Sequence, residues 1–527
     1  MTVVAIDFGT SNTAIATFDP VTNTPRTVRF PQISRCFESP QGQVYVVPSL
    51  VFVQSPDSYV FGEQVRSQRL GFAQPHRFFQ AFKRDMAADF RPPSRSIDGV
   101  PYDAEAIADI FITSLWQQLA LQRIQPTQLI FTVPVGAFES YVDWFRDLAK
   151  RLILPPMKIV DESTAAALGY AVQKMGAVVL VIDFGGGTLD ISLVRTVAPN
   201  SLKPAIKAEV LAKSDAFIGG IDVDTWIAEY WLRSRGESRN TIGEIGWLNL
   251  LELAERIKVQ LSQVDEAKES WFDDENFIAY ELSLHRDQLA EILESHQLLE
   301  QLRQAIDEVL AIALNKGINK AAIEQVLLVG GSCLLPAVQQ LVVSYFGRTK
   351  VKLDKTFEAV AHGALLLGQA ITVDDYLRHG YAIRLWEPYV RQYSFFTLFE
   401  KGTKYPCQRL EPLTLQVATE GQREIRLDIG EVADTTQAEV TYDAKGRMTS
   451  SLIHKQSDFR SLADLAKSKG QAQTDICVAH LDPPGQTGMD RISVEFEVNE
   501  QRILLATVKD LLTEKILVDR VAIAKLE

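Results

Sequence analysis

Two segments far apart in the sequence share one order of residues: an apolar run, Asp-Phe-Gly, a turn rich in small residues, and a second apolar run. The first is VVAIDFGTSNTAIA at residues 3–16, and the second is LVIDFGGGTLDISLV at residues 180–194. Each pattern predicts two strands joined by a glycine turn. Asp7 and Asp183 are 183 − 7 = 176 residues apart, so the repeat is as large as a domain. Two similar halves could therefore enclose one ligand from both sides.

The chemistry of these turns points to phosphate and a metal ion. Backbone N–H groups that no Cβ covers form a concave site suited to phosphate oxygens. The aspartate at each strand end faces the metal that accompanies the phosphates, and Mg²⁺ prefers water and one or two carboxylates. A single glycine turn between hairpin strands is usually only a turn. Two copies in matched context favour a nucleotide clamped twice, with Asp7 and Asp183 near its magnesium.

Up to about residue 370 the pattern alternates strands with helices. Residues 1–60 read as a sheet rich in hairpins, and apolar residues at helical spacing predict a helix over 103–122. A buried strand at 129–135 follows, and another at 325–331 precedes a helix at 336–346. This alternation predicts an α/β architecture.

Beyond residue 385 the sequence reads as short strands separated by turn residues, with a helix predicted only at 458–470. This pattern is typical of a separate all-β domain, most simply a sandwich. The predicted domains are therefore 1–370, a linker at 371–384, and 385–527.

Composition limits the binding partners and the cellular compartment that we expect for the protein. The 54 basic and 67 acidic side chains give a net charge of −13, so nucleic acid and anionic membrane are not expected as partners. The four cysteines lack the paired spacing of a zinc site or a disulfide framework. No signal peptide and no apolar run approaching 18 residues is present. We expect a cytoplasmic protein.

Several ordered motifs together resemble a known family. They are IDFGTSNTAIA, FTVPVGAF, VDESTAAALGYA, VIDFGGGTLDISLV, IGGIDVD, AERIKVQLS and VLLVGGSCLLPAVQQLV. In order and spacing they resemble the nucleotide-binding domain of the Hsp70 chaperones, whose superfamily also holds actin and sugar kinases. SFFTLFEKGTKYP and GMDRISVEFEVNEQRILLATVKD resemble strands of the Hsp70 substrate-binding β-sandwich. The resemblance implies a two-lobed, actin-like α/β ATPase domain followed by an all-β sandwich.

The resemblance also implies cofactors and residue roles, with ATP or ADP and Mg²⁺ as ligands. Asp7 and Asp183 would hold Mg²⁺ through its waters. Lys83 would reach the γ-phosphate with Glu162 as its acidic partner, and Thr188 and Asp190 would place the attacking water. The residues implied in nucleotide binding are Thr10, Ser11, Gly185, Gly186, Gly187, Gly219, Gly220, Glu255, Lys258, Ser262, Gly330, Gly331 and Ser332. Without the resemblance, Lys83 reads as a surface charge, and Glu255 with Lys258 as an ordinary helix pair at i, i+3.

Three features depart from the family pattern. Leu334 stands where the family usually has an arginine that packs on the adenine face. The interdomain linker is replaced by TVDDYLRHGYAI at residues 372–383, which loses the family's apolar run. The sequence ends soon after the β-domain, so we expect the helical lid of an ordinary Hsp70 to be absent.

The leading hypothesis is an ATP-dependent Hsp70-like chaperone that binds extended apolar peptide segments, with slow Mg²⁺-dependent hydrolysis and co-chaperones as further partners. The alternative is an ATP-binding interaction module whose hydrolysis or coupling has decayed and which serves one dedicated partner. A sugar kinase ranks third, because no second α/β extension carries a sugar site and a β-sandwich has no place in that scheme.

Overall fold

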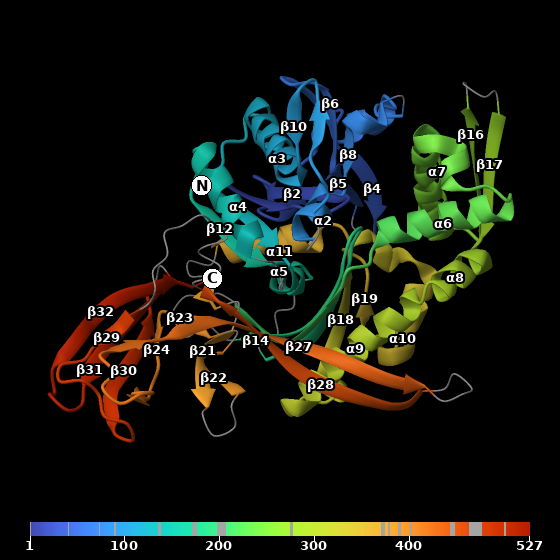
Figure 1. Ribbon diagram of the computed structural model, residues 1–527. Coiled ribbons are helices and arrows are strands. Elements are labelled where there is room, and N and C mark those ends of the chain that lie inside the picture. The colour runs from blue at the N-terminus through green and yellow to red at the C-terminus, as the bar shows by residue number, and fades with distance from the viewer. Residues whose placement is uncertain are drawn as a thin grey trace. The chain divides into compact units, whose positions relative to one another are not determined.

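The computed structural model describes residues 2–40, 42–72, 74–88, 91–134, 139–170, 176–197, 207–273, 278–369, 375–377, 380–387, 392–400, 403–442, 448–462, 477–499 and 502–526. The chain divides into two compact units, Met1–Val373 and Asp374–Glu527, and Figure 1 traces both from the blue N-terminus to the red C-terminus. No helix among the described residues has the length and apolar character needed to cross a membrane.

The first unit begins with a seven-stranded sheet in the order β12-β11-β1-β2-β5-β4, with β3 paired to β2. Strand β1 runs parallel to β11 and antiparallel to β2. The elements of this N-terminal half are β1 (Val3–Asp7), β2 (Asn12–Phe18), β3 (Pro25–Thr27), β4 (Arg35–Ser39), β5 (Gly42–Pro48), β6 (Leu50–Ser55), β7 (Ser58–Phe61), α1 (Glu63–Ser67), β8 (Phe78–Gln80), α2 (Phe82–Ala87), β9 (Arg95–Ile97), β10 (Val100–Tyr102), α3 (Ala104–Leu121), β11 (Gln128–Val133), α4 (Glu139–Arg151), β12 (Met157–Asp161) and α5 (Glu162–Gly169). Helix α3 starts where the Asp103 carboxylate accepts the Ala106 N–H at 2.8 Å, which satisfies a free donor of the first turn.

The C-terminal half of the first unit is built on a five-stranded sheet in the order β15-β14-β13-β18-β19. As in the first sheet, its central strand β13 pairs antiparallel with the following strand and parallel with a later one, β18. Its elements are β13 (Val178–Phe184), β14 (Leu189–Val197), β15 (Lys207–Ala216), α6 (Gly220–Ser234), α7 (Arg239–Leu261), β16 (Glu266–Asp273), β17 (Ile278–His285), α8 (Arg286–Ser295), α9 (Leu298–Asn315), β18 (Ile323–Val329), α10 (Pro336–Phe346), β19 (Val351–Lys352) and α11 (Ala359–Gln369).

Helices α5 and α11 connect the two halves. Their alanines share one buried cluster with residues of β1, β2, β13 and β18. The helices cross very closely, because a Cβ on Gly169 would lie 1.8 Å from the Ala359 carbonyl oxygen, and one on Gly363 would lie 1.7 Å from that of Ala165. Both positions therefore require glycine, and the crossing fixes the two sheets against the same pair of helices.

The second unit is built of β-strands in the described residues. They are β20 (Asp375–Tyr376), β21 (Gly380–Glu387), β22 (Gln392–Phe399), β23 (Lys404–Tyr405), β24 (Cys407–Gln408), β25 (Leu413–Gln416), β26 (Glu424–Arg426), β27 (Asp428–Tyr442), β28 (Met448–Ser461), β29 (Cys477–His480), β30 (Asp490–Val498), β31 (Ile503–Asp510) and β32 (Ile516–Lys525). A four-stranded sheet (β22-β21-β27-β28) and a five-stranded sheet around β30 and β31 both contribute to one apolar core.

Two sequence predictions differ from the structure. Residues 458–461, predicted to start a helix, end strand β28, because pairing with β27 outweighs local propensity; residues 463–470 lie outside the described residues. Part of the predicted linker 371–384 is also structured, since β20 and the start of β21 fall within it. Leu377 between them is only 1% exposed in the core of the second unit, and its N–H donates to the Thr403 carbonyl at 2.7 Å.

Candidate active site

The two Asp-Phe-Gly turns lie at the ends of the central strands β1 and β13. After β13 the Gly185 N–H donates to the Thr188 carbonyl at 3.1 Å, which closes the turn tightly. After β1 the turn is held by Ser49, whose hydroxyl donates to the Gly9 carbonyl at 2.7 Å and whose N–H donates to the Ser11 carbonyl at 2.9 Å. Both turns are thus rigidly held by their own half of the unit.

The two turns contact each other directly. A Cβ added to Gly186 would lie 1.9 Å from the Ser11 hydroxyl oxygen, and one added to Gly187 would lie 2.8 Å from Thr10 Cγ2. Gly219 also lies close to the second turn, since a Cβ added to it would lie 2.3 Å from the Gly186 carbonyl oxygen. Close backbone approach requires glycine at position 219, whereas Gly186 and Gly187 lie against the side chains of Ser11 and Thr10. The repeated phrases of the sequence therefore meet at one place.

A buried charged cluster is formed by the strand ends and the elements beside them. The Lys83 ammonium lies 3.1 Å from a carboxylate oxygen of Glu162, and these side chains are only 13% and 10% exposed. Asp7 accepts a hydrogen bond from the Thr132 hydroxyl at 2.8 Å. Asp183 and Asp190 are cross-strand partners in β13 and β14. Lys83 is therefore not the surface charge that its sequence context alone suggests.

Negative charge exceeds positive charge in this cluster. Burial raises the pKa of Asp7, although Lys83 and the Thr132 hydroxyl oppose the shift. Burial raises the pKa of Glu162 to about 7 against the attraction of Lys83. For Asp183, burial and the nearby carboxylates together raise the pKa well above its usual value.

Lys83 itself shows the opposite balance. Burial alone would lower its pKa, but Glu162, Tyr141 and Asp7 together outweigh burial and raise the pKa above its usual range. The neighbouring Tyr141 phenol is buried without a hydrogen-bond partner, and burial raises its pKa.

This donor set fits a divalent cation. Several buried carboxylates with raised pKa values share one ammonium, so a bound cation would relieve their mutual repulsion. In the part of the chain that the structure describes, no three His, Cys, Asp or Glu side chains converge closely enough to ligate a metal directly. Mg²⁺ needs no such set, because it keeps several waters and uses one or two carboxylates plus phosphate oxygens. Asp7 and Asp183 are the carboxylates that would hold it.

A cavity of about 520 Å³ opens beside the two turns. Ten of the residues implied in nucleotide binding line it: Thr10, Ser11, Gly185, Gly186, Gly220, Glu255, Lys258, Ser262, Gly331 and Ser332. Gly187, Gly219 and Gly330 do not line it. The cluster residues also lie outside its lining: Asp7, Lys83, Glu162, Asp183, Thr188 and Asp190. The cavity and the buried cluster thus share the two turns as a boundary.

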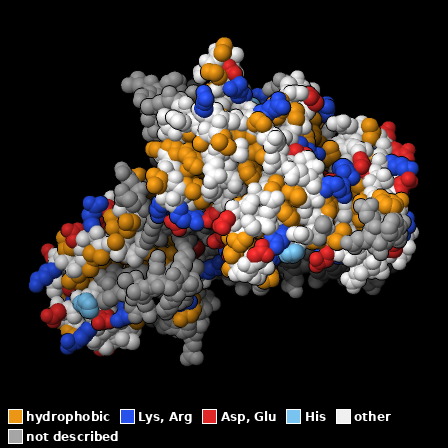
Figure 2. Space-filling view, turned by 90° about the horizontal axis from the view of Figure 1, so that it is seen from above, with side chains coloured by type: hydrophobic (Ala, Val, Ile, Leu, Met, Phe, Trp, Pro, Cys, Tyr) orange, Lys and Arg blue, Asp and Glu red, His pale blue; other side chains and the backbone are white. Residues whose placement is uncertain are grey.

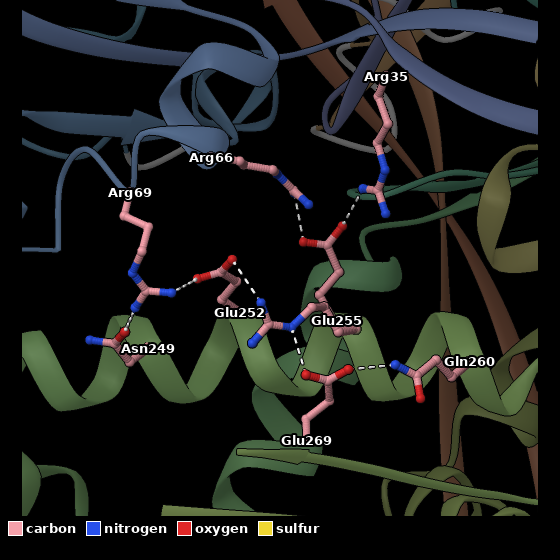
Figure 3. Close-up of polar contacts among 9 residues, drawn as sticks. Arg35, Arg66, Arg69, Asn249, Glu252, Glu255, Gln260 and Glu269 are labelled. Atoms are coloured by element: carbon pink, nitrogen blue, oxygen red, sulfur yellow. Dashed lines mark hydrogen bonds and ion pairs between the residues drawn. The ribbon is translucent and has the colours of Figure 1, made fainter. Parts of the chain in front are cut away.

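Glu255 on α7 joins the two halves of the unit across this cavity. Arg66 and Arg35 come from the N-terminal half and bind its two carboxylate oxygens at 2.6 Å and 3.3 Å; Figure 3 shows both guanidinium groups pointing toward it. Burial opposes ionisation of Glu255, but Arg66 and its other cationic neighbours outweigh burial and lower the pKa to about 2. Glu255 is therefore a firmly ionised anchor rather than an exposed helix residue.

Lys258, one turn further along α7, is paired in a similar way. Its ammonium lies 2.7 Å from the Asp224 carboxylate and donates to the Gly220 carbonyl at 2.8 Å. Burial raises the pKa of Asp224 to about 7 despite this partner. Lys258 thus ties α7 to the start of α6, beside the glycine pair that approaches the second turn.

Sequence reasoning missed several residues of this site. Arg35 and Arg66 are 220 and 189 residues from Glu255 in the chain, and no local pattern marks that pairing. Tyr141 lies outside any motif. Asp224 could have been found from the sequence, because it is the last residue of the motif IGGIDVD.

The distribution of charged side chains on the surface bears on whether nucleic acid is a partner. On the face shown in Figure 2, Lys and Arg side chains are interspersed with Asp and Glu rather than gathered in one continuous area. A nucleic-acid footprint would need a clustered basic face.

A comparison with known families matches residues 145–376 to the family model described as Hsp70 protein. The matched region contains the second turn with Asp183, the helix α7 with Glu255 and Lys258, and the Gly330-Gly331-Ser332 turn. The family implies an actin-like ATPase fold, and the mixed α/β structure of the first unit agrees with it. This match over residues 145–376 supports membership of the Hsp70 family.

Proposed function

We propose that the first unit binds Mg²⁺-ATP and hydrolyses it slowly, and that the second unit binds extended apolar peptide segments and releases them when ATP binds. The observation that carries this proposal is the direct contact of the two Asp-Phe-Gly turns, with a buried cluster of one lysine and several carboxylates behind them. The two halves of the first unit would be the two lobes of the ATPase, and the two sheets of the second unit would form the sandwich.

Each residue of the cluster has a defined task in this proposal. Phosphoryl transfer depends mainly on positioning and on neutralising charge, and bound Mg²⁺ would supply part of that neutralisation. Asp7 and Asp183 would hold the ion through water, and Lys83, oriented by Glu162 at 3.1 Å, would stabilise charge on the transferred phosphate. Asp190, hydrogen-bonded to Thr188, would orient the attacking water.

Two anchored residues of α7, Glu255 and Lys258, would contact the sugar of the nucleotide. Glu255 keeps its charge and Lys258 is fixed against Gly220, so both present polar groups to the cavity at fixed positions. The salt bridges of Glu255 join both halves of the unit. A bound nucleotide would therefore leave the cavity either beside these salt bridges or after they separate.

The peptide-binding part rests on the second unit. Strand β22 exposes two aromatic side chains, Tyr393 at 55% and Phe395 at 39%. Extended peptides bind β-domains through main-chain hydrogen bonds and pockets for apolar side chains, and the Hsp70 family in general binds peptide substrates with co-chaperones.

The nucleotide part is tested with one variant and one control. Asp183→Asn should weaken Mg²⁺-dependent ATP binding and abolish steady-state turnover, measured by calorimetric titration and phosphate release. Asp265→Asn is the matched control, since Asp265 is 75% exposed and pairs only with surface Arg286 among the contacts described. Parent-like binding and turnover in Asp183→Asn would contradict the assignment of the site.

A second function is favoured by one observation. Leu377, in the segment expected to couple the domains, is buried in the second unit's own core and is not free to dock elsewhere in this structure. The alternative is therefore an ATP-binding module with decayed coupling, whose second unit holds one dedicated partner. ATP binding together with peptide binding that ignores ATP would favour it.

A further inference from the structure

Two phenylalanines form a flat wall of the cavity in the first unit. Phe37 on β4 and Phe357, just before α11, stack with their ring centroids 4.3 Å apart and their planes 12° apart. Both rings line the cavity beside the two turns, and both are only partly buried. The pair therefore presents aromatic surface to whatever fills the cavity.

Phe357 is held at a fixed distance from the Gly-Gly-Ser turn. The Gly330 N–H donates to the carbonyl of Thr356 at 2.8 Å, which anchors the residue before the ring. A Cβ on Gly331 would lie 3.2 Å from a carbon of the Phe357 ring, so this turn packs against the ring edge. The ring and the turn therefore belong to the same end of the cavity.

Phe37 is connected to the proposed sugar contacts. The Arg35 guanidinium lies 4.9 Å from the Phe37 ring centroid, and the same side chain binds Glu255 at 3.3 Å. The aromatic pair and Glu255 thus share one arginine. A nucleoside whose sugar lies at Glu255 would bring its base toward the aromatic pair.

Several other side chains that line the cavity are apolar or are already hydrogen-bonded. Its other lining side chains include the apolar residues Val259, Leu334, Leu335 and Leu353. Among the polar ones, the Gln339 amide donates to the Leu334 carbonyl at 3.1 Å. The Ser262 hydroxyl donates to the Lys258 carbonyl at 3.3 Å. These donors are already engaged with the protein's own backbone.

We infer that Phe357, backed by Phe37, is the base-stacking residue of the nucleotide site, and that the base is recognised by stacking rather than by hydrogen bonds to its edge. This inference rests on the proposed function, because it assumes that a nucleoside triphosphate fills the cavity. Every purine offers the same kind of π-face to an aromatic ring. ATP and GTP should therefore bind with affinities within about tenfold of each other, well below the discrimination that paired edge contacts provide.

The test is a set of calorimetric titrations of the full chain with Mg²⁺ and three probes: ATP, GTP and base-free ribose 5′-triphosphate. Phe357→Ala should weaken ATP and GTP alike by roughly 5- to 150-fold, the loss expected for one stacked base. It should leave ribose 5′-triphosphate unchanged, which a general distortion of the site would not do. Phe357→Tyr should retain parent-like binding of both nucleotides, and Phe37→Ala should lose part of it. Phe272→Ala is the matched control, because Phe272 is 51% exposed on β16 and does not line the cavity.

The outcomes separate this inference from the function on which it rests. Parent protein that binds ATP while Phe37→Ala and Phe357→Ala bind it equally well would overturn the stacking role and leave the proposed function standing. Parent protein that prefers ATP to GTP by more than about 100-fold would overturn recognition by stacking alone. Absence of binding to all three probes would overturn the proposed function, and this inference with it.

Discussion

Replacing Lys83 by methionine removes the ammonium that pairs with Glu162 while keeping an apolar stem of similar length. The pair is 3.1 Å long, with side chains 13% and 10% exposed. At an effective dielectric constant near 20, two unit charges at that distance attract by about 5 kcal/mol. Removal of one partner of a buried pair typically costs about 3–5 kcal/mol of the free energy of unfolding.

Protonation of Glu162 can reduce this loss of unfolding free energy, so we expect a value at the lower end of the range. Its pKa is already raised to about 7 by burial, so without Lys83 it takes up a proton near neutral pH. We expect Lys83→Met to lower the free energy of unfolding by about 3 kcal/mol. The double variant Lys83→Met/Glu162→Gln should recover at least half of that loss, because no carboxyl group is then left without its partner.

The assay is urea unfolding followed by tryptophan fluorescence. Of the seven tryptophans, all except Trp386 lie in the first unit, so the signal reports mainly on that unit. Lys268→Met is the control: it breaks an exposed pair with Glu281, with both side chains 59% exposed, and should change stability by less than about 1 kcal/mol. A Lys83→Met loss no larger than that of the control, or a double variant no more stable than the single one, would show that the buried pair does not stabilise the first unit in this way.

Three further predictions concern other buried groups. Arg491→Met should lower the stability of the second unit by about 3–5 kcal/mol in scanning calorimetry, because it leaves the fully buried Asp510 carboxylate without its cationic partner. Arg520→Met breaks a more exposed pair and should cost under about 1 kcal/mol; equal losses in the two variants would contradict the prediction for Arg491. Leu377→Ala should cost about 2–5 kcal/mol in the same unit, whereas a freely exposed linker residue would cost almost nothing. Burial lowers the pKa of His362 to about 4, so protonation favours the unfolded state and stability should fall by about 2 kcal/mol between pH 7 and pH 5; His362→Gln should remove that part of the pH dependence in urea unfolding, and an unchanged dependence would show that other groups cause it.

Local elements of the first unit could be predicted because their signals are local. The helix predicted over 103–122 is α3 (Ala104–Leu121), with Asp103 as its cap, and the helix predicted over 336–346 has the same bounds as α10. Helix α9 is not among the predicted elements, although its sequence carries a signal: buried Leu298, Leu302 and Ile306 recur at helical spacing.

Features that depend on distant parts of the chain could not be predicted in this way. The arginines that bind Glu255 come from another half of the unit, and the stacked Phe37 and Phe357 are 320 positions apart, since 357 − 37 = 320. Leu377 lies in a short acidic segment that reads as a linker, and only the tertiary packing of the second unit shows it to be core. Pairings of this kind arise from the fold and leave no periodic trace in the sequence.

In the proposed cycle, ATP in the first unit changes peptide binding in the second. The most direct test of this coupling is the dissociation constant of a fluorescent Leu-rich peptide for the full chain, measured by anisotropy with and without Mg²⁺-ATP. Coupling free energies between two sites on one protein usually change affinity by roughly 5- to 150-fold. Saturating Mg²⁺-ATP should weaken peptide binding within that range, and Asp183→Asn should abolish the effect. An identical dissociation constant with and without ATP, in protein shown to bind both ligands, would contradict the proposed coupling.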